Sequence, residues 1–393
     1  MARLAAALSM VALSLSAFGA QPVPGWPAVE QLYLQQVKAA GIVGSGLVLV
    51  REGAVAARAV VGYQDLDAKR LVDADTIYHW ASITKTFTGI AIMQLRDRGR
   101  LSLDDPIVKH VPEFRRVHNP YGDISQVTIK HMMTHSSGLP ASTWPWGGDQ
   151  PWQPFEPTEW AQLTAMLPYT QLEFAPGTKY SYSNPGVVFL GRIIELLSGD
   201  DYEVYIGKNI LMPLGMHASF FDRAPYHLLP HRSHSYLRTD AGLTEARFDF
   251  DTGITVSNGG LNAPLADMAR YLAFLMEGSA AAKNDAVLKR SSVEEMWRPQ
   301  IRAQDGEGAT GADAQSGLSF FLERHAGFDF VAHSGDQNGF ISHFYLHRPS
   351  RTAYAVSFNT NVSASKTTSS RPTTRQVDAA VRDAIIREVI ARP

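Results

Sequence analysis

Residues 82–97, SITKTFTGIAIMQLRD, form the stretch on which the fold depends. From Thr84 to Asp97 the sequence is apolar almost all round an expected helix, which Gly99 would end. A helix that is apolar on every side needs burial on every side, so we expect it to lie between two parts of the fold. Ser82 and Lys85 stand at its start, three residues apart and therefore on one face.

Outward from this helix, strand-forming segments lie near both ends of the chain. Residues 42–50 and 54–64, separated by a turn at Glu52-Gly53, predict a hairpin. Later strands are expected at residues 318–323, 328–332, 340–347 and 352–359. Neither set alone makes a covered sheet, so we expect the hairpin to pair with the later strands.

The expected fold class is α+β, an α/β sandwich. Its antiparallel sheet is built from N-terminal and C-terminal strands flanked by helices, with an inserted, mostly helical domain and the active site between the two. Helices are expected at residues 27–40, 186–197, 266–276 and 375–392. The predicted divisions are a signal peptide at 1–20, a sheet domain at 21–82 and 265–393, and a helical domain at 83–264.

The composition excludes several classes of protein. The 393 residues are 45% hydrophobic, which is enough for a large buried core. Because 36 Lys and Arg stand against 38 Asp and Glu, the chain lacks the basic excess that nucleic-acid binding needs. It contains no cysteine, so any nucleophile must be an oxygen or a nitrogen.

The first 20 residues have the pattern of a signal peptide. Arg3 precedes an apolar run at residues 4–18, and small residues surround a cleavage point after Gly19 or Ala20. The run is shorter than the roughly 20 apolar residues that span a bilayer. We therefore expect a cleaved leader, with a retained N-terminal anchor as the alternative. After cleavage we expect no stable membrane insertion, and a periplasmic or secreted protein.

The pair Ser82 and Lys85 is a candidate for covalent catalysis. A serine hydroxyl is a poor nucleophile until a base takes its proton, and a desolvated lysine can be neutral enough to help. The following helix also aims free amides at any oxyanion formed beside Ser82. Ser363-Ala364-Ser365-Lys366 has the same spacing, but it lies in a polar linker, so its position favours Ser82.

Two further motifs follow in order. Tyr182-Ser183-Asn184 lies in a loop, where Tyr182 can lose its proton more easily than in water and relay it, unless it merely packs on the core. Asn184 offers an amide that can orient a substrate carbonyl. His333-Ser334-Gly335 ends the expected strand at 328–332, whereas the similar His325-Ala326-Gly327 falls in the preceding turn.

Other enzyme signatures are missing or incomplete in the sequence. It contains neither Gly-x-Ser-x-Gly nor Gly-x-x-x-x-Gly-Lys-Ser/Thr. His131 and His135 have the spacing of a zinc helix, but Met132 occupies the place of the general-base glutamate. A looser cluster contains His227, His231 and His234. Packing, capping or solvated histidines are the simpler interpretation, so we expect no metal and no cofactor.

The three motifs resemble those of the serine β-lactamases and penicillin-binding proteins, within them the subgroup of class C β-lactamases, D-Ala-D-Ala carboxypeptidases and related esterases. Further segments typical of this subgroup are LSLDDP at 101–106, TIKHMMTHSSGLP at 128–140, FAPG at 174–177 and GGL at 259–261. The resemblance extends from about Val37 to Asn361 and implies a split sheet with inserted helices.

The resemblance also implies roles for the residues at matching positions. Ser82 would be the acylated nucleophile, Lys85 its proton partner and Tyr182 the general base. Asn184 would hold the substrate amide, and the backbone amides of Ser82 and Asp336 would form the oxyanion hole. Asp336 directly follows His333-Ser334-Gly335.

The third motif departs from the Lys-Thr-Gly of class C β-lactamases and is similar to the His-x-Gly of the carboxypeptidases and esterases. A neutral His333 cannot hold a carboxylate as a charged lysine can, but a histidine protonated near neutrality would help to hold one. The carboxylate of Asp336 would repel an anionic substrate if it pointed inward; the alternative is a turn residue that faces solvent.

The sequence therefore predicts an exported serine hydrolase that forms an acyl-enzyme on Ser82 and cleaves amides or esters of small-molecule or peptide substrates. A D-Ala-D-Ala-type peptidase is slightly preferred, with a carboxylesterase or a slowly deacylating penicillin-binding or sensor module as alternatives. Trp144, Trp146, Trp152 and Trp160 lie in one segment and either line a pocket rim or pack on the helical domain. The oligomeric state stays open.

Overall fold

The computed structural model describes residues 23–140, 157–246, 252–276, 281–304, 308–311, 313–363 and 371–392. The predicted leader at residues 1–20 lies outside the described residues, as do Trp144, Trp146 and Trp152 and most of the competing motif at 363–366.

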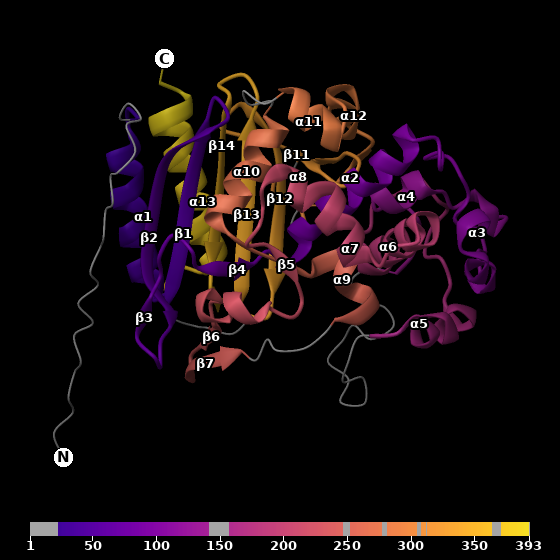
Figure 1. Cartoon of the computed structure of the whole chain (residues 1–393), viewed down its shortest axis with the longest axis horizontal. Coiled ribbons are helices and arrows are strands. Elements are labelled where there is room, and N and C mark those ends of the chain that lie inside the picture. The colour runs from indigo at the N-terminus through magenta and orange to yellow at the C-terminus, as the bar shows by residue number, and fades with distance from the viewer. Residues whose placement is uncertain are drawn as a thin grey trace.

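One antiparallel sheet, built from both ends of the chain, forms the centre of the fold (Figure 1). Within the described residues it contains nine strands in the order β3-β2-β1-β14-β13-β12-β11-β10-β9. Their bounds are β1 Gly44–Arg51, β2 Ala54–Asp65, β3 Arg70–Leu71, β9 Ile301–Arg302, β10 Gln315–Ser316, β11 Phe321–His325, β12 Phe328–Gln337, β13 Phe340–His347 and β14 Thr352–Phe358. Strand β1 pairs with β14, with Leu47 opposite Val356, which confirms that the hairpin joins the later strands.

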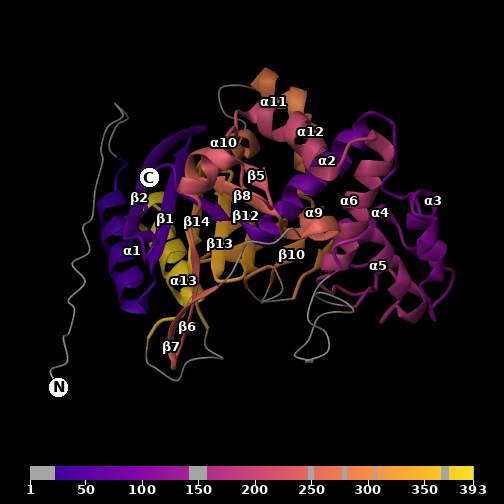
Figure 2. The same cartoon turned by 60° about the horizontal axis from the view of Figure 1, so that its bottom comes forward.

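The sheet has a packed core on each face because successive side chains of a strand point in opposite directions. In β1, Leu47 belongs to a core shared with α1 (Trp26–Ala40) and α13 (Thr374–Ile385), whereas its neighbour Val48 belongs to the opposite core. Figures 1 and 2 show α1 and α13 on one side of the sheet and α10 (Leu265–Leu275) on the other.

The second core continues from the sheet into a group of helices. Helix α2 (Thr84–Asp97) is buried at every position from Thr84 to Leu95, as its sequence predicts. The remaining helices are α3 Ile107–His110, α4 Ile129–Met133, α5 Trp160–Met166, α6 Asn184–Ser198, α7 Tyr202–Ile206, α8 Met212–Leu214, α9 Val256–Gly259, α11 Ala281–Val287 and α12 Arg290–Met296. Because this core includes side chains from both predicted domains, the division at residues 82 and 265 stays a prediction.

Two small sheets connect segments that are distant in the sequence. One contains β4 (Ile77–His79), β8 (Leu261–Pro264) and β5 (Phe220–Phe221). The other contains β15 (Thr360–Val362), β6 (Ser235–Thr239) and β7 (Gly242–Ala246). Pairing of β4 with β8 brings the chain just before Ser82 beside the segment that follows α9.

The expected element boundaries were wrong at three points that affect the site. Strand β12 continues to Gln337, so His333-Ser334-Gly335 lies inside the strand instead of at its end. Strand β11 begins at Phe321 and not at residue 318. Asn184 is the first residue of α6, so Tyr182 directly precedes the cap of a helix. The polar stretch of β12 lacks apolar alternation, and its ladder with β13 keeps it extended.

Candidate active site

Ser82 lies in a 3₁₀ turn, Ala81–Ile83, directly before α2. The turn begins with Ala81 at φ 46°, a left-handed conformation that non-glycine residues rarely adopt. Trp80 is held on both its backbone and its ring, since its backbone N–H donates to Leu261 O at 2.8 Å and its Nε1–H donates to Ala263 O at 2.8 Å. Strand β8 therefore fixes the chain that presents Ser82.

Lys85 contacts Ser82, as the three-residue spacing predicts. Its Nζ donates to Ser82 Oγ at 2.9 Å and to the Asn258 carbonyl oxygen at 2.8 Å. The Lys85 side chain is fully buried, so these two oxygens replace part of its lost hydration. Asn258 was not predicted from the sequence, although it directly precedes the GGL segment at 259–261.

Tyr182 lies beside both Ser82 and Lys85. Its hydroxyl interacts with the Ser82 side chain, and its ring centroid lies 4.9 Å from Lys85 Nζ. Burial raises the pKa of Tyr182 above its ordinary value of 10, and the interaction with Ser82 opposes this rise. The expectation that Tyr182 loses its proton easily is therefore wrong, because the resting hydroxyl keeps its proton at neutral pH.

The third motif approaches the turn that carries Ser82 very closely. A Cβ on Gly335 would lie 2.2 Å from the Trp80 carbonyl oxygen, so only glycine allows the two backbones to meet here. Ser334 Oγ donates to the Gly308 carbonyl oxygen at 2.9 Å, which anchors the strand from the side.

His333 is fully buried, and its Nδ1–H donates to the Ser334 carbonyl oxygen at 2.7 Å. Burial, together with the nearby charge of Lys85, lowers the pKa of His333 to about 3. The histidine is therefore neutral near pH 7, and the expectation that it is protonated near neutrality is wrong. Among the described residues, His333 Nε2 and Asn184 Oδ1 are buried without a hydrogen-bond partner, so each can accept from a substrate donor.

Asp336 lies near the end of β12. The ladder of β12 with β13 reaches Gln337, whereas its ladder with β11 ends at Ala332. The Asp336 side chain is exposed, and its Oδ2 accepts from Arg375 Nη2 at 2.8 Å. This ion pair ties the carboxylate to the first turn of α13, in a strand rather than in the turn that the sequence suggested.

The sequence also failed to identify His135 as part of the site. Its ring stacks on Tyr182 with the centroids 4.4 Å apart and the planes at 29°. Burial, with Lys85 and His333 nearby, lowers the pKa of His135 well below 6.5. His135 lies in the segment at 128–140, but only its spacing from His131 had drawn attention to it.

The other candidate residues have structural partners. His131 Nδ1 accepts from the Thr128 backbone N–H at 3.2 Å at the start of α4, and His234 pairs with Glu245 at 2.6 Å. Trp160 packs edge to face on Phe189 at 5.6 Å, which is core packing. The described part of the chain contains no cluster of His, Asp and Glu arranged to hold a metal ion.

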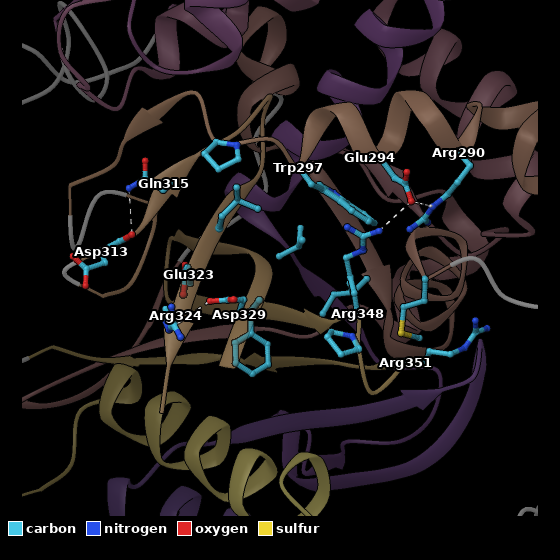
Figure 3. A pocket seen from close by; sticks show the side chains of 17 residues that line it. Arg290, Glu294, Trp297, Asp313, Gln315, Glu323, Arg324, Asp329, Arg348 and Arg351 are labelled. Carbon is cyan, nitrogen blue, oxygen red and sulfur yellow. Dashed lines mark hydrogen bonds and ion pairs between the residues drawn. The ribbon is translucent and has the colours of Figure 1, made fainter. Parts of the chain in front are cut away.

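A separate hollow of about 910 Å³ lies between α12 and strands β11 to β13 (Figure 3). Trp297 is in its wall, with the guanidinium carbons of Arg290 and Arg348 4.9 and 5.2 Å from the indole ring. Both arginines also pair with Glu294, as Figure 3 shows. No residue of the three motifs lines this hollow, so it is separate from the candidate active site.

The fold and the site together define the class of protein. A serine, a buried lysine and a tyrosine meet at the start of a buried helix, beside strand β12 of an antiparallel sheet, as in serine hydrolases that transfer acyl groups. The chain belongs to the Beta-lactamase family, whose sequence model matches residues 29–379. No helix among the described residues has the length and apolar character needed to cross a membrane.

Similar proteins include hydrolases and a penicillin-binding protein homologue. The chain is 32% identical to Protein flp of Staphylococcus aureus (strain N315) over 193 residues, 49% of this chain and 38% of that protein. It is 29% identical to Esterase EstB of Burkholderia gladioli over 214 residues, 51% of this chain and 54% of that protein. The chain thus spans about half or less of the length of these curated relatives.

Solved structures share the fold over nearly the whole chain. The octameric penicillin-binding protein homologue from Pyrococcus abyssi superposes with a TM-score of 0.75 at 26% identity, covering 92% of this chain and 77% of that chain. A D-amino acid amidase from Ochrobactrum anthropi SV3 superposes with a TM-score of 0.74 at 20% identity, covering 92% of this chain and 99% of the other. The fold-class prediction is confirmed by these matches.

Proposed function

We propose that the protein is an exported serine hydrolase that forms an acyl-enzyme on Ser82. Its proposed substrates are esters or amides whose leaving group carries no charge. The observation that carries the proposal is the buried Lys85 amine, whose Nζ lies 2.9 Å from Ser82 Oγ, with the Tyr182 ring beside Nζ and its hydroxyl interacting with Ser82. A nucleophile, its base and a proton relay are thus adjacent before any substrate binds.

In the proposed acylation, Lys85 acts as the neutral amine, which the resting ammonium becomes by losing one proton to solvent. Ser82 Oγ attacks the acyl carbon while this amine takes the hydroxyl proton. The Tyr182 hydroxyl gives its proton to the leaving oxygen or nitrogen, and the Lys85 ammonium returns a proton to Tyr182. The bond to the leaving group breaks, and the acyl group stays on Ser82. Because Tyr182 starts protonated, this relay agrees with its raised pKa better than a resting phenolate would.

The tetrahedral oxygen would be stabilised by the backbone N–H groups of Ser82 and Asp336. Two observations support this pair. Gly335 permits contact between β12 and the turn before Ser82, and β11 no longer pairs with β12 beyond Ala332. Asn184, with an unpartnered buried Oδ1, would accept a hydrogen bond from the acyl side of the substrate.

The preference for an uncharged leaving side rests on the two polar groups of β12 beside the site. His333 is neutral and so supplies no positive charge to a carboxylate. Asp336 carries a negative charge, and Arg375 is already paired with it. An anionic substrate therefore gains little attraction at this edge, which favours the esterase and amidase alternatives over a β-lactamase.

A D-Ala-D-Ala-type peptidase remains the second candidate, because the half-exposed Arg375 could exchange Asp336 for a substrate carboxylate. The similarity to the Pyrococcus penicillin-binding protein homologue adds support. Export to the periplasm or beyond is part of both proposals and rests on the leader pattern at residues 1–20. N-terminal sequencing of the mature protein recovered from outside the cytoplasm, starting at residue 20 or 21, would support export.

Intact-mass spectrometry would separate these functions. The protein is mixed in turn with para-nitrophenyl acetate, a penicillin and a D-Ala-D-Ala peptide, and the adduct and released product are followed with time. We expect rapid turnover of the aryl acetate and an acetyl group trapped on Ser82 by acid quenching. Turnover by Ser82→Ala at the native rate would refute the proposal, and a stable penicillin adduct without turnover would favour the sensor module.

A further inference from the structure

His135 contacts the chain on both sides of Tyr182. Its carbonyl oxygen accepts from the Ser181 backbone N–H at 2.8 Å, and its ring Nδ1 accepts from the Ser183 backbone N–H at 3.2 Å. One residue therefore binds both neighbours of Tyr182, while its ring stacks on the Tyr182 ring at 4.4 Å. Ser183 also caps α6, since its Oγ accepts from the Gly186 N–H at 3.2 Å.

The chemical state of His135 follows from these bonds. Because the Ser183 N–H donates to Nδ1, that nitrogen carries no proton and the imidazole is neutral. Protonation would remove the acceptor and place a second cation near Lys85, which already lies 4.9 Å from the centre of the Tyr182 ring. The side chain is 2% exposed, so water cannot substitute for the lost bond.

The backbone at His135 also limits which residue can serve. Its φ of 54° is left-handed, a conformation in which His and Asn are enriched among non-glycine residues. Asparagine can supply an acceptor there but no ring. Phenylalanine supplies a ring but no acceptor, whereas histidine supplies both.

We infer that His135 is a positioning residue for the proton relay: it fixes the direction of the Tyr182 hydroxyl toward Ser82 and takes no proton itself. This inference rests on the proposed function, with Tyr182 passing a proton both when Ser82 is acylated and when water hydrolyses the acyl-enzyme. A small displacement of the relay would slow the chemical step and leave substrate binding nearly unchanged. Removing His135 should therefore lower kcat with little change in KM.

The test is a double-mutant cycle measured with para-nitrophenyl acetate. We expect His135→Phe to lower kcat roughly tenfold to a hundredfold, with KM within about twofold. His135→Asn should lower kcat less than His135→Phe does, because asparagine suits the left-handed backbone and retains a hydrogen-bond acceptor. In a Tyr182→Phe background either substitution should change kcat by less than about twofold, because the residue acts only through Tyr182.

The matched control is His131→Asn, because His131 also accepts a backbone N–H through Nδ1 but contacts Thr128 instead of the Tyr182 segment. It should leave kcat unchanged. Equal losses in the native and Tyr182→Phe backgrounds, or native kcat in both His135 variants, would overturn the inference. Thermal unfolding of each variant identifies any that fails to fold, and His135→Asn keeps the test decisive if His135→Phe does. Retained turnover in Ser82→Ala would instead refute the proposed function itself.

Discussion

The Asp336 carboxylate and the Arg375 guanidinium form a 2.8 Å ion pair that joins β12 to the start of α13. Asn361 Nδ2 also donates to Asp336 Oδ1 at 3.4 Å. The pair cancels two charges close to the motif His333-Ser334-Gly335. In the proposed function, the pair would set the charge that a substrate meets beside this motif, without involving Ser82.

Replacing Asp336 with Asn should free Arg375 for a substrate carboxylate. We expect KM for a carboxylate-bearing peptide ester to fall roughly threefold to tenfold. The KM for a neutral ester should stay within about twofold of the native value, because the substitution keeps the backbone N–H at position 336. Asp329→Asn is the control, since Asp329 lies on the same strand and pairs with Arg324 at 3.7 Å. Equal changes in both variants would mean that overall charge, not Arg375, is responsible.

Tyr182→Phe should preserve the fold and lower the rate of acylation by roughly a hundredfold or more. The ring and its stacking on His135 remain, and only the hydroxyl that interacts with Ser82 is lost. Stopped-flow measurement of the acylation burst, beside circular dichroism of the folded variant, would check this. A burst at the native rate would make Tyr182 a packing residue.

The selectivity for charged substrates should not change with pH near neutrality. Since the pKa of His333 is about 3, its charge is constant above about pH 5. The ratio of kcat/KM for a carboxylate-bearing peptide to that for a neutral ester should therefore be flat from about pH 5 to 8. Taking the ratio cancels effects of Lys85 and Tyr182 that both substrates share. A ratio that falls as pH rises through the ordinary histidine pKa would show that His333 is protonated after all.

Acid should destabilise the protein partly through His79. Burial lowers the pKa of His79 from 6.5 to about 4, while its ring contacts Gln337 and Asn262 at 3.0 and 3.2 Å. Between these two pKa values the unfolded chain binds more protons than the folded one, so stability falls as pH drops from about 6.5 to 4. His79→Gln should reduce that slope by up to about 1.4 kcal/mol per pH unit.

Urea unfolding at several pH values would measure this slope. His227→Gln is the matched control, because His227 is an exposed histidine in the turn Tyr226–His231. An unchanged slope in His79→Gln would show that other buried groups, such as His333, account for the acid sensitivity.

Local sequence pattern was enough to predict most of the sheet and the contact between Ser82 and Lys85. Strands β1, β13 and β14 are rich in apolar residues, and the three-residue spacing of Ser82 and Lys85 places their side chains on one face of a helical turn. The burial of individual side chains, in contrast, could not be predicted from local sequence pattern. The pKa values of Tyr182 and His333 depend on complete desolvation by distant segments, so the protonation expected from sequence was wrong for both residues.

The residues that the sequence missed act through their backbone or through unusual conformation. Asn258 contributes only a carbonyl oxygen to Lys85, an atom that every residue has. His135 reaches Tyr182 from a left-handed turn that helical spacing with His131 does not predict. The ion pair of Asp336 with Arg375 depends on where α13 returns to the sheet.

The pairing of Leu47 with Val356 also has a consequence for biosynthesis. The ribosome completes the β1–β2 hairpin and the turn carrying Ser82 long before it makes β12, β13 and β14. Until then, one edge of β1 has no neighbour in the sheet and can pair with another chain. Contacts this far apart in sequence also form slowly. We therefore expect nascent chains to need protection from aggregation, and catalytic activity to arise only when the last strands have been made.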